Sequence, residues 1–374
     1  MTEPLTVAIP REVKTDERRV ALTPDGVREL EAHGIEVVVE AGAGVGAGIT
    51  DDAYRAAGAD IAANATETWA RGQLVCKVKE PQAEELALLR DDLVLFTFLH
   101  LAAYPKVAHA LLDAGTSAVG YETVQRADGG LPLLAPMSEV AGRLAVQVGA
   151  RFLEAPQGGR GVLLGGAPGV QPGRVVVIGA GNVGWNSAWI AAGMEAEVNL
   201  LDRDLDRLRF TDQIHRGRIS TLASNKGTLE RTVAEADLVI GAVLVAGDRA
   251  PVVVTEEMVA SMKPGAVIVD VAIDQGGCVA TSRETTHREP VFEEHGVVHY
   301  CVGNIPGAVP HTSTLALTNA TLPYLRELAL HGVTEACRRD PELAVGLNTE
   351  AGHVVNGAVA HSLDLPAQRA SFTA

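Results

Sequence analysis

The stretch Gly179-Ala180-Gly181-Asn182-Val183-Gly184 decides the fold, together with the apolar run Arg174–Ile178 directly before it. Glycines at these spacings allow a tight turn out of a strand and a close approach of the backbone to a pyrophosphate, with the next helix aiming its N-terminus at the negative charge. Glycine-rich turns are common, so the motif needs support from its context. Leu200-Leu201-Asp202 supplies an acidic strand end about 20 residues after the motif begins, where a ribose diol is normally bound. The sequence therefore predicts a dinucleotide-binding α/β unit.

The position of this motif matters as much as its glycines. It lies near the middle of a chain of 374 residues, which indicates that another domain surrounds the nucleotide module. This length predicts two or three domains of about 150 residues each.

Composition restricts the class of protein. Hydrophobic residues make up 47% of the chain and aromatic residues only 4%, which is typical of parallel strands buried under alanine-rich helices. The net charge of −16 argues against nucleic-acid binding, and no apolar stretch is long enough to cross a membrane. The N-terminus shows no signal sequence. The four cysteines are scattered and read as reduced thiols, with no zinc motif. We expect a soluble cytoplasmic enzyme, without a membrane or nucleic-acid partner.

Strand and helix patterns alternate along both parts of the chain. In the first part we expect strands at residues 5–9, 35–40, 74–78 and 93–99, and helices at 23–34 and 83–89. Residues 126–132 form a turn-rich break, followed by a helix from Ser138 to about Glu154. Later strands are expected at 174–178, 197–201, 238–245 and 266–273, and the chain after 307 is expected to be helical, clearest at 315–330.

This order predicts an α/β protein with two Rossmann-like, doubly wound domains. The nucleotide-binding domain, residues 134–307, is inserted into a discontinuous second domain, residues 1–133 and 308–374. The final helices are expected to return and complete that domain.

Polar residues at strand ends are the candidates for chemistry, since ligands bind beyond the carboxyl ends of parallel strands. His100 ends an apolar run and is either a core histidine or a general acid/base. Lys77 and Lys79 alternate, so only one reaches a cleft; we expect Lys79 to do so and Lys77 to lie on a solvated strand edge. Arg19 either binds a carboxylate with its planar fork or is a surface charge.

Two further candidates lie later in the chain. Asp274 either caps the turn before Gly276-Gly277 or delivers a carboxylate to the nucleotide, whereas we expect Asp270 to have a structural role. Glu327 and His331 stand four residues apart on one helix face, a spacing that suits a divalent metal or an ordinary surface pair.

Five strings of sequence, taken in order, resemble the alanine dehydrogenase/pyridine nucleotide transhydrogenase family, and most closely its alanine dehydrogenases. They are Ile9-Pro10-Arg11-Glu12 leading to Arg19-Val20-Ala21-Leu22-Thr23-Pro24, Lys77-Val78-Lys79-Glu80-Pro81, Phe98-Leu99-His100-Leu101, Ala135-Pro136-Met137-Ser138-Glu139-Val140-Ala141-Gly142-Arg143, and Ala272-Ile273-Asp274-Gln275-Gly276-Gly277. The resemblance covers nearly the whole chain.

The resemblance implies NAD-dependent oxidative deamination of L-alanine to pyruvate and ammonium, and the reverse reductive amination, in a homo-hexamer. It implies that Arg19 and Lys79 bind the substrate and that His100 and Asp274 are the catalytic pair, so that two domains contribute to one cleft. Magnesium at Glu327 and His331 is implied by some relatives. The implied NAD-binding residues are Ser138, Gly179, Gly181, Asn182, Val183, Gly184, Asp202, Arg207, Ser224, Val243, Leu244, Val271, Ala272, Ile273, Asp274, Arg283, Val302, Gly303, Asn304 and Ile305. Relatives can carry lysine in place of Arg207 and methionine in place of Ile305.

Asp202 favours NAD over NADP, because a 2′-phosphate at this strand end would meet a carboxylate; Arg203 and Arg207 nearby weaken that preference. Two other functions remain open on the sequence alone. One is the NAD-binding part of a transhydrogenase, which does not need His100, Asp274 and the two cationic substrate ligands together. The other is a non-enzymatic NAD-binding regulator that has kept the fold.

Overall fold

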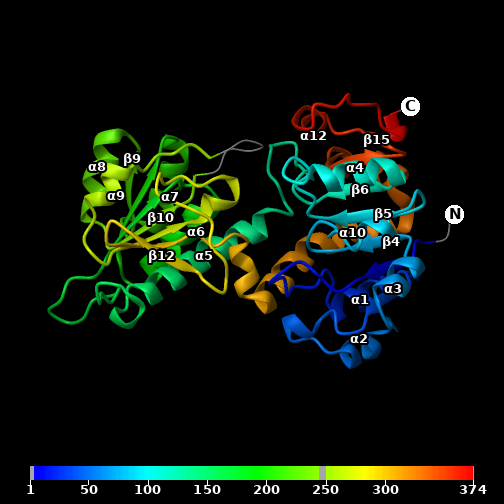
Figure 1. The fold of residues 1–374 in the computed structure, drawn as a ribbon, viewed down its shortest axis with the longest axis horizontal. Coiled ribbons are helices and arrows are strands. Elements are labelled where there is room, and N and C mark those ends of the chain that lie inside the picture. Colours follow the sequence, from blue (N-terminus) through cyan, green and yellow to red (C-terminus); the bar gives the residue numbers. More distant parts are fainter. Residues whose placement is uncertain (1–3, 244–249, 374) are drawn as a thin grey trace. The chain divides into compact units, whose positions relative to one another are not determined.

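The structure is a computed structural model that describes residues 4–243 and 250–373. The chain divides into two compact units (Figure 1). Unit 1 comprises Met1–Met137 and Val309–Ala374, and unit 2 comprises Ser138–Ala308. The chain passes from unit 1 to unit 2 within the helix α5 (Ala135–Phe152) and returns to unit 1 just before α10 (Pro310–Arg339).

Unit 1 is built on an eight-stranded sheet with the order β15-β14-β6-β5-β4-β1-β2-β3. The six strands from β3 to β6 are parallel, and β14 and β15 extend the β6 edge through two antiparallel pairs, β6 with β14 and β14 with β15. Their bounds are β1 (Val7–Ile9), β2 (Val37–Glu40), β3 (Asp60–Ala62), β4 (Leu74–Cys76), β5 (Val94–Thr97), β6 (Ser117–Gly120), β14 (Leu347–Glu350) and β15 (His353–Val354). The chain leaves β1 toward β2 on one side and later returns to β4 on the other, so the strand order reverses between β1 and β4.

Helices cover this sheet, and local sequence explains where they begin. Thr23 caps α1 (Pro24–Glu31) by accepting a hydrogen bond from the Gly26 N–H at 3.3 Å, and Pro24 stands in the first turn. In α10 the backbone of Gly332 leaves the helical region with a φ of +69°. The Leu5 N–H donates to the Ala329 carbonyl at 2.7 Å, which attaches the start of the first strand region to α10. The other helices of unit 1 are α2 (Asp51–Ala57), α3 (Ala65–Arg71), α4 (Pro105–Ala114), α11 (Pro341–Gly346) and α12 (Gly357–Ser362).

Unit 2 repeats the same topology on a seven-stranded sheet with the order β12-β13-β11-β10-β7-β8-β9. All neighbours are parallel except the β12–β13 pair, and the strand order reverses between β7 and β10. The strands are β7 (Arg174–Ile178), β8 (Glu197–Asp202), β9 (Ser220–Ala223), β10 (Leu238–Gly241), β11 (Val267–Asp270), β12 (Val291–Glu294) and β13 (Val297–Tyr300). Besides most of α5, the helices are α6 (Asn182–Gly193), α7 (Leu205–His215), α8 (Lys226–Glu235) and α9 (Glu256–Ala260). The predicted α/β class with two doubly wound units is thus confirmed.

Several predicted elements differ from those in the structure. Residues 83–89 form only the 3-10 turn Leu86–Leu88, because Glu85 turns inward to an ion pair with Lys77. The strand expected to reach residue 273 ends at Asp270, whose carboxylate accepts the Ala272 N–H and begins a 3-10 helix, Val271–Gln275. The strand expected at 238–245 ends at Gly241, and residues 244 and 245 lie outside the described residues. The C-terminal part adds β14 and β15 to its helices, and these two strands join the sheet of unit 1.

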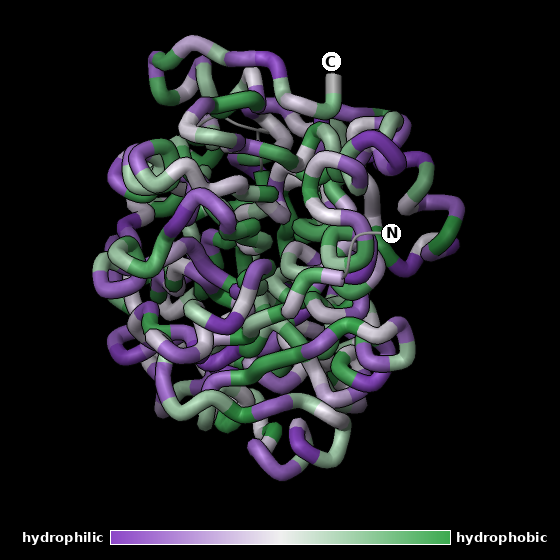
Figure 2. Tube along the Cα trace, turned by 90° about the vertical axis from the view of Figure 1, so that its right-hand side faces the viewer, coloured by the Kyte–Doolittle hydropathy of each residue, from purple (hydrophilic) through white to green (hydrophobic). Residues whose placement is uncertain are grey.

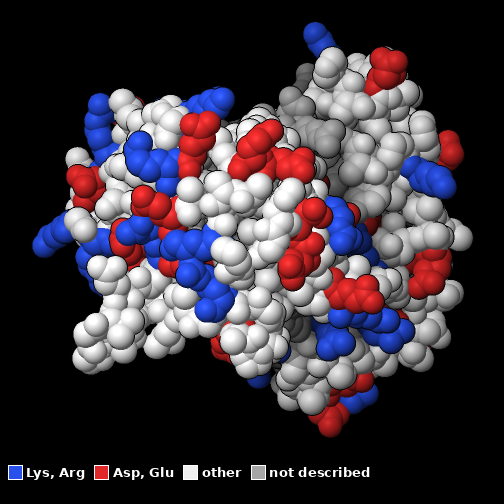
Figure 3. Space-filling model, turned by 60° about the vertical axis from the view of Figure 1, so that its left-hand side comes forward, with Lys and Arg blue, Asp and Glu red and all other residues white. Residues whose placement is uncertain are grey.

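Polarity follows the layers of each unit. Viewed toward the unit that contains both termini, apolar segments lie in the interior of the trace and polar segments at its margins (Figure 2). Separate apolar clusters fill the two units, one around Leu95 and Trp69 and the other around Val239 and Ile268. Positive and negative side chains are interspersed on the face that Figure 3 displays. Within the described residues, no helix is both long enough and apolar enough for a transmembrane span.

Candidate active site

The glycine loop of unit 2 has a backbone that only glycine allows. Gly179 follows β7 with a φ of +103°, and a Cβ there would lie 2.5 Å from the carbonyl oxygen of Ala242, just beyond β10. A Cβ on Gly184 would lie 1.7 Å from the Gly179 carbonyl oxygen. Gly181 is the N-cap of α6 and offers no side-chain hydrogen bond to the first turn. The first N–H groups of α6 are therefore not capped by a side chain, as a site for a phosphate group requires.

Asp202 lies beside this loop at the end of β8. Its carboxylate accepts the Ala180 N–H at 2.6 Å and the Asp204 N–H at 2.8 Å. Arg207, on the exposed side of α7, approaches Asp202 at 3.9 Å and Asp204 at 3.5 Å. The acidic end of β8 is thus hydrogen-bonded to the glycine loop, and the positively charged side chain of Arg207 lies beside it.

The other predicted NAD-binding residues of unit 2 follow the carboxyl ends of its parallel strands. Ser224 comes directly after β9, Val243 lies just beyond β10, and Leu244 falls outside the described residues. Val271, Ala272, Ile273 and Asp274 form the 3-10 helix after β11, and Val302, Gly303, Asn304 and Ile305 follow β13. Because these strands are parallel, their ends share one edge of the sheet. Ser138 lies in α5 and so does not follow a strand.

Asp274 and Asp270 have different roles in this loop. Asp274 is exposed and accepts the Asn304 N–H at 3.1 Å. Asp270 is buried and accepts the N–H groups of Cys278 and Val279 at 2.9 and 3.1 Å and the Ser282 hydroxyl at 2.7 Å. Asp270 therefore fixes the loop that carries Asp274, in agreement with its predicted structural role.

Arg283 is exposed and lies against an aromatic ring. Its guanidinium carbon is 4.0 Å from the centroid of the Phe292 ring, which stacks on His299 at 4.9 Å. Stacking of this kind fixes the plane of a guanidinium group.

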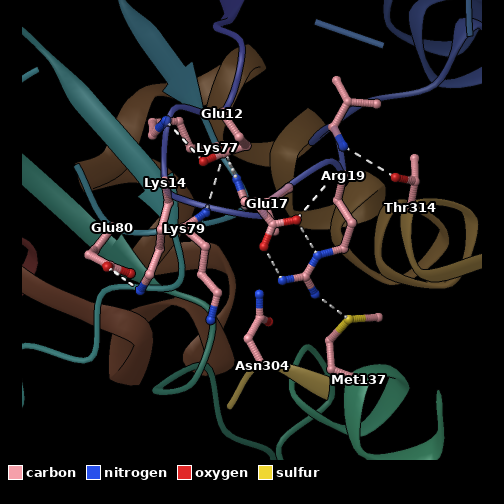
Figure 4. A network of polar contacts seen from close by, with 12 residues as sticks. Glu12, Lys14, Glu17, Arg19, Lys77, Lys79, Glu80, Met137, Asn304 and Thr314 are labelled. Atoms are coloured by element: carbon pink, nitrogen blue, oxygen red, sulfur yellow. Dashed lines mark hydrogen bonds and ion pairs between the residues drawn. The ribbon is translucent and has the colours of Figure 1, made fainter. Parts of the chain in front are cut away.

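Arg19 is a buried residue of unit 1 and not a surface charge, with an exposed fraction of 2%. Glu17 accepts hydrogen bonds from its Nε at 2.7 Å and from its Nη2 at 2.6 Å (Figure 4). Its Nη1 donates to the thioether sulfur of Met137 at 3.1 Å. Burial with a matched carboxylate makes the orientation of this guanidinium well defined.

The prediction that Lys77 lies on a solvated strand edge is wrong, because this side chain is fully buried. Its Nζ lies 3.2 Å from Glu12 and 2.8 Å from Glu85. Burial favours the neutral amine, but the attraction of Glu12 and Glu85 outweighs it and raises the pKa of Lys77. Burial also raises the pKa of Glu12, and Lys77 offsets this only in part.

Lys79 lies beyond β4 and is half-buried. Glu12 accepts the Val78 N–H at 2.6 Å and the Lys79 N–H at 3.4 Å, so the ion pair with Lys77 also fixes the backbone that carries Lys79 (Figure 4). The Lys79 Nζ lies over the Phe98 ring, 6.0 Å from its centroid.

His100 is the third residue beyond β5 and is half-buried. Its imidazole stacks on Phe98 with 5.6 Å between the ring centroids, and its backbone N–H donates to Glu122 at 2.6 Å. Phe98 therefore contacts both Lys79 and His100, the two candidates that follow neighbouring strands.

Sequence reasoning did not identify three carboxylates that orient these candidates: Glu12, Glu17 and Glu122. Glu12 stands in one of the strings that carry the family resemblance, which was its only signal. Glu122 and its partner His100 are 22 residues apart, so no local pattern connects them.

Glu327 and His331 form an ion pair of unit 1, with 3.6 Å between Oε2 and Nε2. Arg339 and Arg326 also approach Glu327, at 3.9 and 4.0 Å. Across the described part of the chain, no three His, Cys, Asp or Glu side chains gather where they could bind a metal ion. The structure therefore gives no support to a magnesium site at Glu327 and His331, and these contacts agree with the alternative prediction of an ordinary surface pair.

These features define a dinucleotide-binding protein built from two doubly wound α/β units. The chain matches the N-terminal domain of the alanine dehydrogenase/PNT family over residues 8–141 and its C-terminal domain over residues 145–357. It belongs to this family.

Individual relatives agree along nearly the whole chain. The alanine dehydrogenase of Mycobacterium tuberculosis is 56% identical over 97% of this chain and 98% of its own length. A solved structure of an L-alanine dehydrogenase superposes with a TM-score of 0.93 at 49% identity, covering 96% of this chain and 99% of the other. A transhydrogenase structure from Sinorhizobium meliloti superposes with a TM-score of 0.81 at 26% identity, covering 94% and 99%.

Proposed function

We propose that this protein is an alanine dehydrogenase, which interconverts L-alanine, NAD⁺ and water with pyruvate, ammonium, NADH and a proton. The observation that carries this function is the 56% identity with the Mycobacterium tuberculosis alanine dehydrogenase over 97% of the chain. The polar strand ends of both units also favour an enzyme over a binding protein that has only kept the fold.

The residues around the glycine loop fit NAD. The space beside Gly179 and Gly184 excludes any Cβ, and the uncapped N-terminus of α6 suits the pyrophosphate. Asp202 suits a ribose diol and disfavours a 2′-phosphate. When bound, NAD⁺ accepts the hydride from Cα of L-alanine.

Arg19 and Lys79 bind the substrate in this proposal. The Arg19 Nη1 donates to the Met137 thioether, which is a weak acceptor, and a substrate carboxylate is a stronger acceptor for the same group. Glu17 keeps the guanidinium in one orientation during this exchange. Lys79 extends from a backbone fixed by Glu12 and suits the carboxylate or carbonyl oxygen of the substrate.

His100 transfers protons, and Asp274 stabilises positive charge on the substrate. Loss of hydride leaves an iminium group; water adds to it, and the resulting carbinolamine collapses to pyruvate and ammonia. Each step after hydride loss moves a proton, for which an imidazole is suited near neutral pH.

The same proposal includes a cytoplasmic homo-hexamer. Four buried free cysteines are compatible with a reducing compartment. Sedimentation equilibrium with a mass six times that of one chain supports the hexamer, and a smaller assembly would contradict it.

One assay tests the activity. The purified protein, mixed with L-alanine and NAD⁺ at alkaline pH, should produce NADH, visible in its absorbance. Tight NAD binding without NADH from alanine would leave the transhydrogenase or regulator functions instead. At the level of residues, His100→Ala should still bind NAD but lose most turnover, and near-normal turnover would remove His100 from the mechanism.

A further inference from the structure

The backbone of His100 adopts a conformation that side-chain-bearing residues rarely occupy. Its φ is +47°, in the left-handed region, and it comes after β5 has ended at Thr97. A histidine that transfers protons needs a fixed position. Glycine would adopt this positive φ without steric cost, but histidine does not. The surrounding structure must therefore hold it in place.

The carboxylate of Glu122 provides this restraint on the backbone. Its Oε1 accepts the His100 N–H at 2.6 Å and the Leu99 N–H at 3.2 Å, and its Oε2 also accepts the Leu99 N–H at 3.2 Å. Hydrogen bonds to an ionised carboxylate are stronger than bonds between neutral groups. Both N–H groups lie beyond the end of β5, where the sheet no longer offers them carbonyl partners, and Glu122 itself follows the end of β6.

The turn after β6, which carries Glu122, also restrains the imidazole. His100 stacks on Phe98 with an angle of 5° between the rings, and Phe98 packs edge-on against Tyr121 at 5.0 Å. Tyr121 is buried and directly precedes Glu122. The turn after β6 thus acts on both the backbone and, through Phe98, the ring of His100.

We propose that Glu122 is a positioning residue for His100, whose carboxylate keeps this histidine in its left-handed conformation and so in place for proton transfer. The proposal rests on the proposed function, because it gives Glu122 no task apart from that of His100.

The test compares Glu122→Ala and Glu122→Gln in the full-length protein. Alanine removes both acceptor atoms; glutamine keeps the volume and one acceptor but loses the charge and places an NH₂ group against an N–H. We expect kcat to fall about tenfold to a hundredfold for alanine, since misplacement by about 1 Å can cost that much. The loss should be smaller for glutamine, with the NAD dissociation constant within about twofold of wild type. Asp113→Asn, which removes an exposed charge from α4, is the control and should leave kcat unchanged.

A double variant separates positioning from other roles. If Glu122 acts through His100, then Glu122→Ala should cost no further activity in the His100→Ala background. Multiplicative losses, or a kcat of Glu122→Ala within about threefold of wild type while His100→Ala is inactive, would overturn the proposal and leave the proposed function standing. Loss of NAD binding by both Glu122 variants would also overturn it, since the carboxylate would then serve the fold. Full activity of His100→Ala would instead contradict the role of His100 itself.

Discussion

At the scale of single residues, the least expected feature is a lysine with no exposed surface. Lys77 lies between Glu12 and Glu85, and all three side chains are almost completely excluded from solvent. Removal of one member of such a group leaves a charge buried without its partner, which is more costly than the interaction itself is favourable.

We therefore expect Lys77→Met to lower the free energy of unfolding by about 3–5 kcal/mol. Adding Glu85→Gln should recover part of this loss, because one unpaired charge is removed. Lys263→Met is the matched control: Lys263 pairs with Asp237 at 2.9 Å but is partly exposed, so its loss should cost no more than about 1 kcal/mol. Guanidinium denaturation measures all three variants. Equal losses for Lys77→Met and Lys263→Met would contradict the burial argument.

The lysine pair also marks how far sequence reasoning extends at this scale. Alternation in a strand correctly placed Lys77 and Lys79 in different environments. It could not say which one is buried, because the deciding partner, Glu12, is 65 residues from Lys77. For Arg19, likewise, burial against Glu17 follows from the folded loop and not from the charges of the segment.

At the scale of elements, the periodic patterns predicted most of the parallel strands, missed β3, β6, β9 and β13, and placed several strand ends too late. Strands stop where a side chain takes over the backbone hydrogen bonds, as Asp270 does after β11 and Glu122 does after β5. Asp274 accordingly lies on a 3-10 helix and not on a strand. A pattern of apolar residues cannot report this, since the competing acceptor belongs to the tertiary structure. The strands β14 and β15 are short and form one end of the sheet, and their few residues give no clear period.

The turn from β7 into α6 gives a test at this scale. Gly184→Ala should abolish measurable NAD binding, because its Cβ would lie 1.7 Å from the Gly179 carbonyl oxygen and would force the loop away from the helix. Gly193→Ala, in the last position of the same helix, meets no atom within 4 Å and should leave binding unchanged. Isothermal titration with NAD distinguishes the two variants. An unaltered affinity in Gly184→Ala would mean that the close approach is not needed for binding.

At the scale of the whole molecule, both units bury cysteine thiols. Cys76 and Cys337 lie in unit 1, and Cys278 and Cys301 in unit 2. Burial raises the pKa of Cys76 and Cys337 to about 12 and that of Cys301 to about 11, and it also raises the pKa of Cys278. The ordinary value is 9.0, so above this pH the unfolded chain loses protons that the folded chain retains. The free energy of unfolding must then fall as pH rises.

This fall bears on the proposed reaction, because oxidation of alanine releases a proton and is favoured by the same alkaline conditions. Between pH 8 and 10 Cys76, Cys301 and Cys337 should each lower the free energy of unfolding by about 1.4 kcal/mol, and together by on the order of 4 kcal/mol, and Cys278 should act in the same direction. Denaturation with guanidinium at fixed protein concentration measures this slope. Cys301→Ala should reduce the slope between pH 8 and 10 by about a quarter. It should leave the slope between pH 6 and 8 unchanged. Stability that stays constant up to pH 10, or a slope that Cys301→Ala does not alter, would show that the buried thiols do not set the alkaline limit.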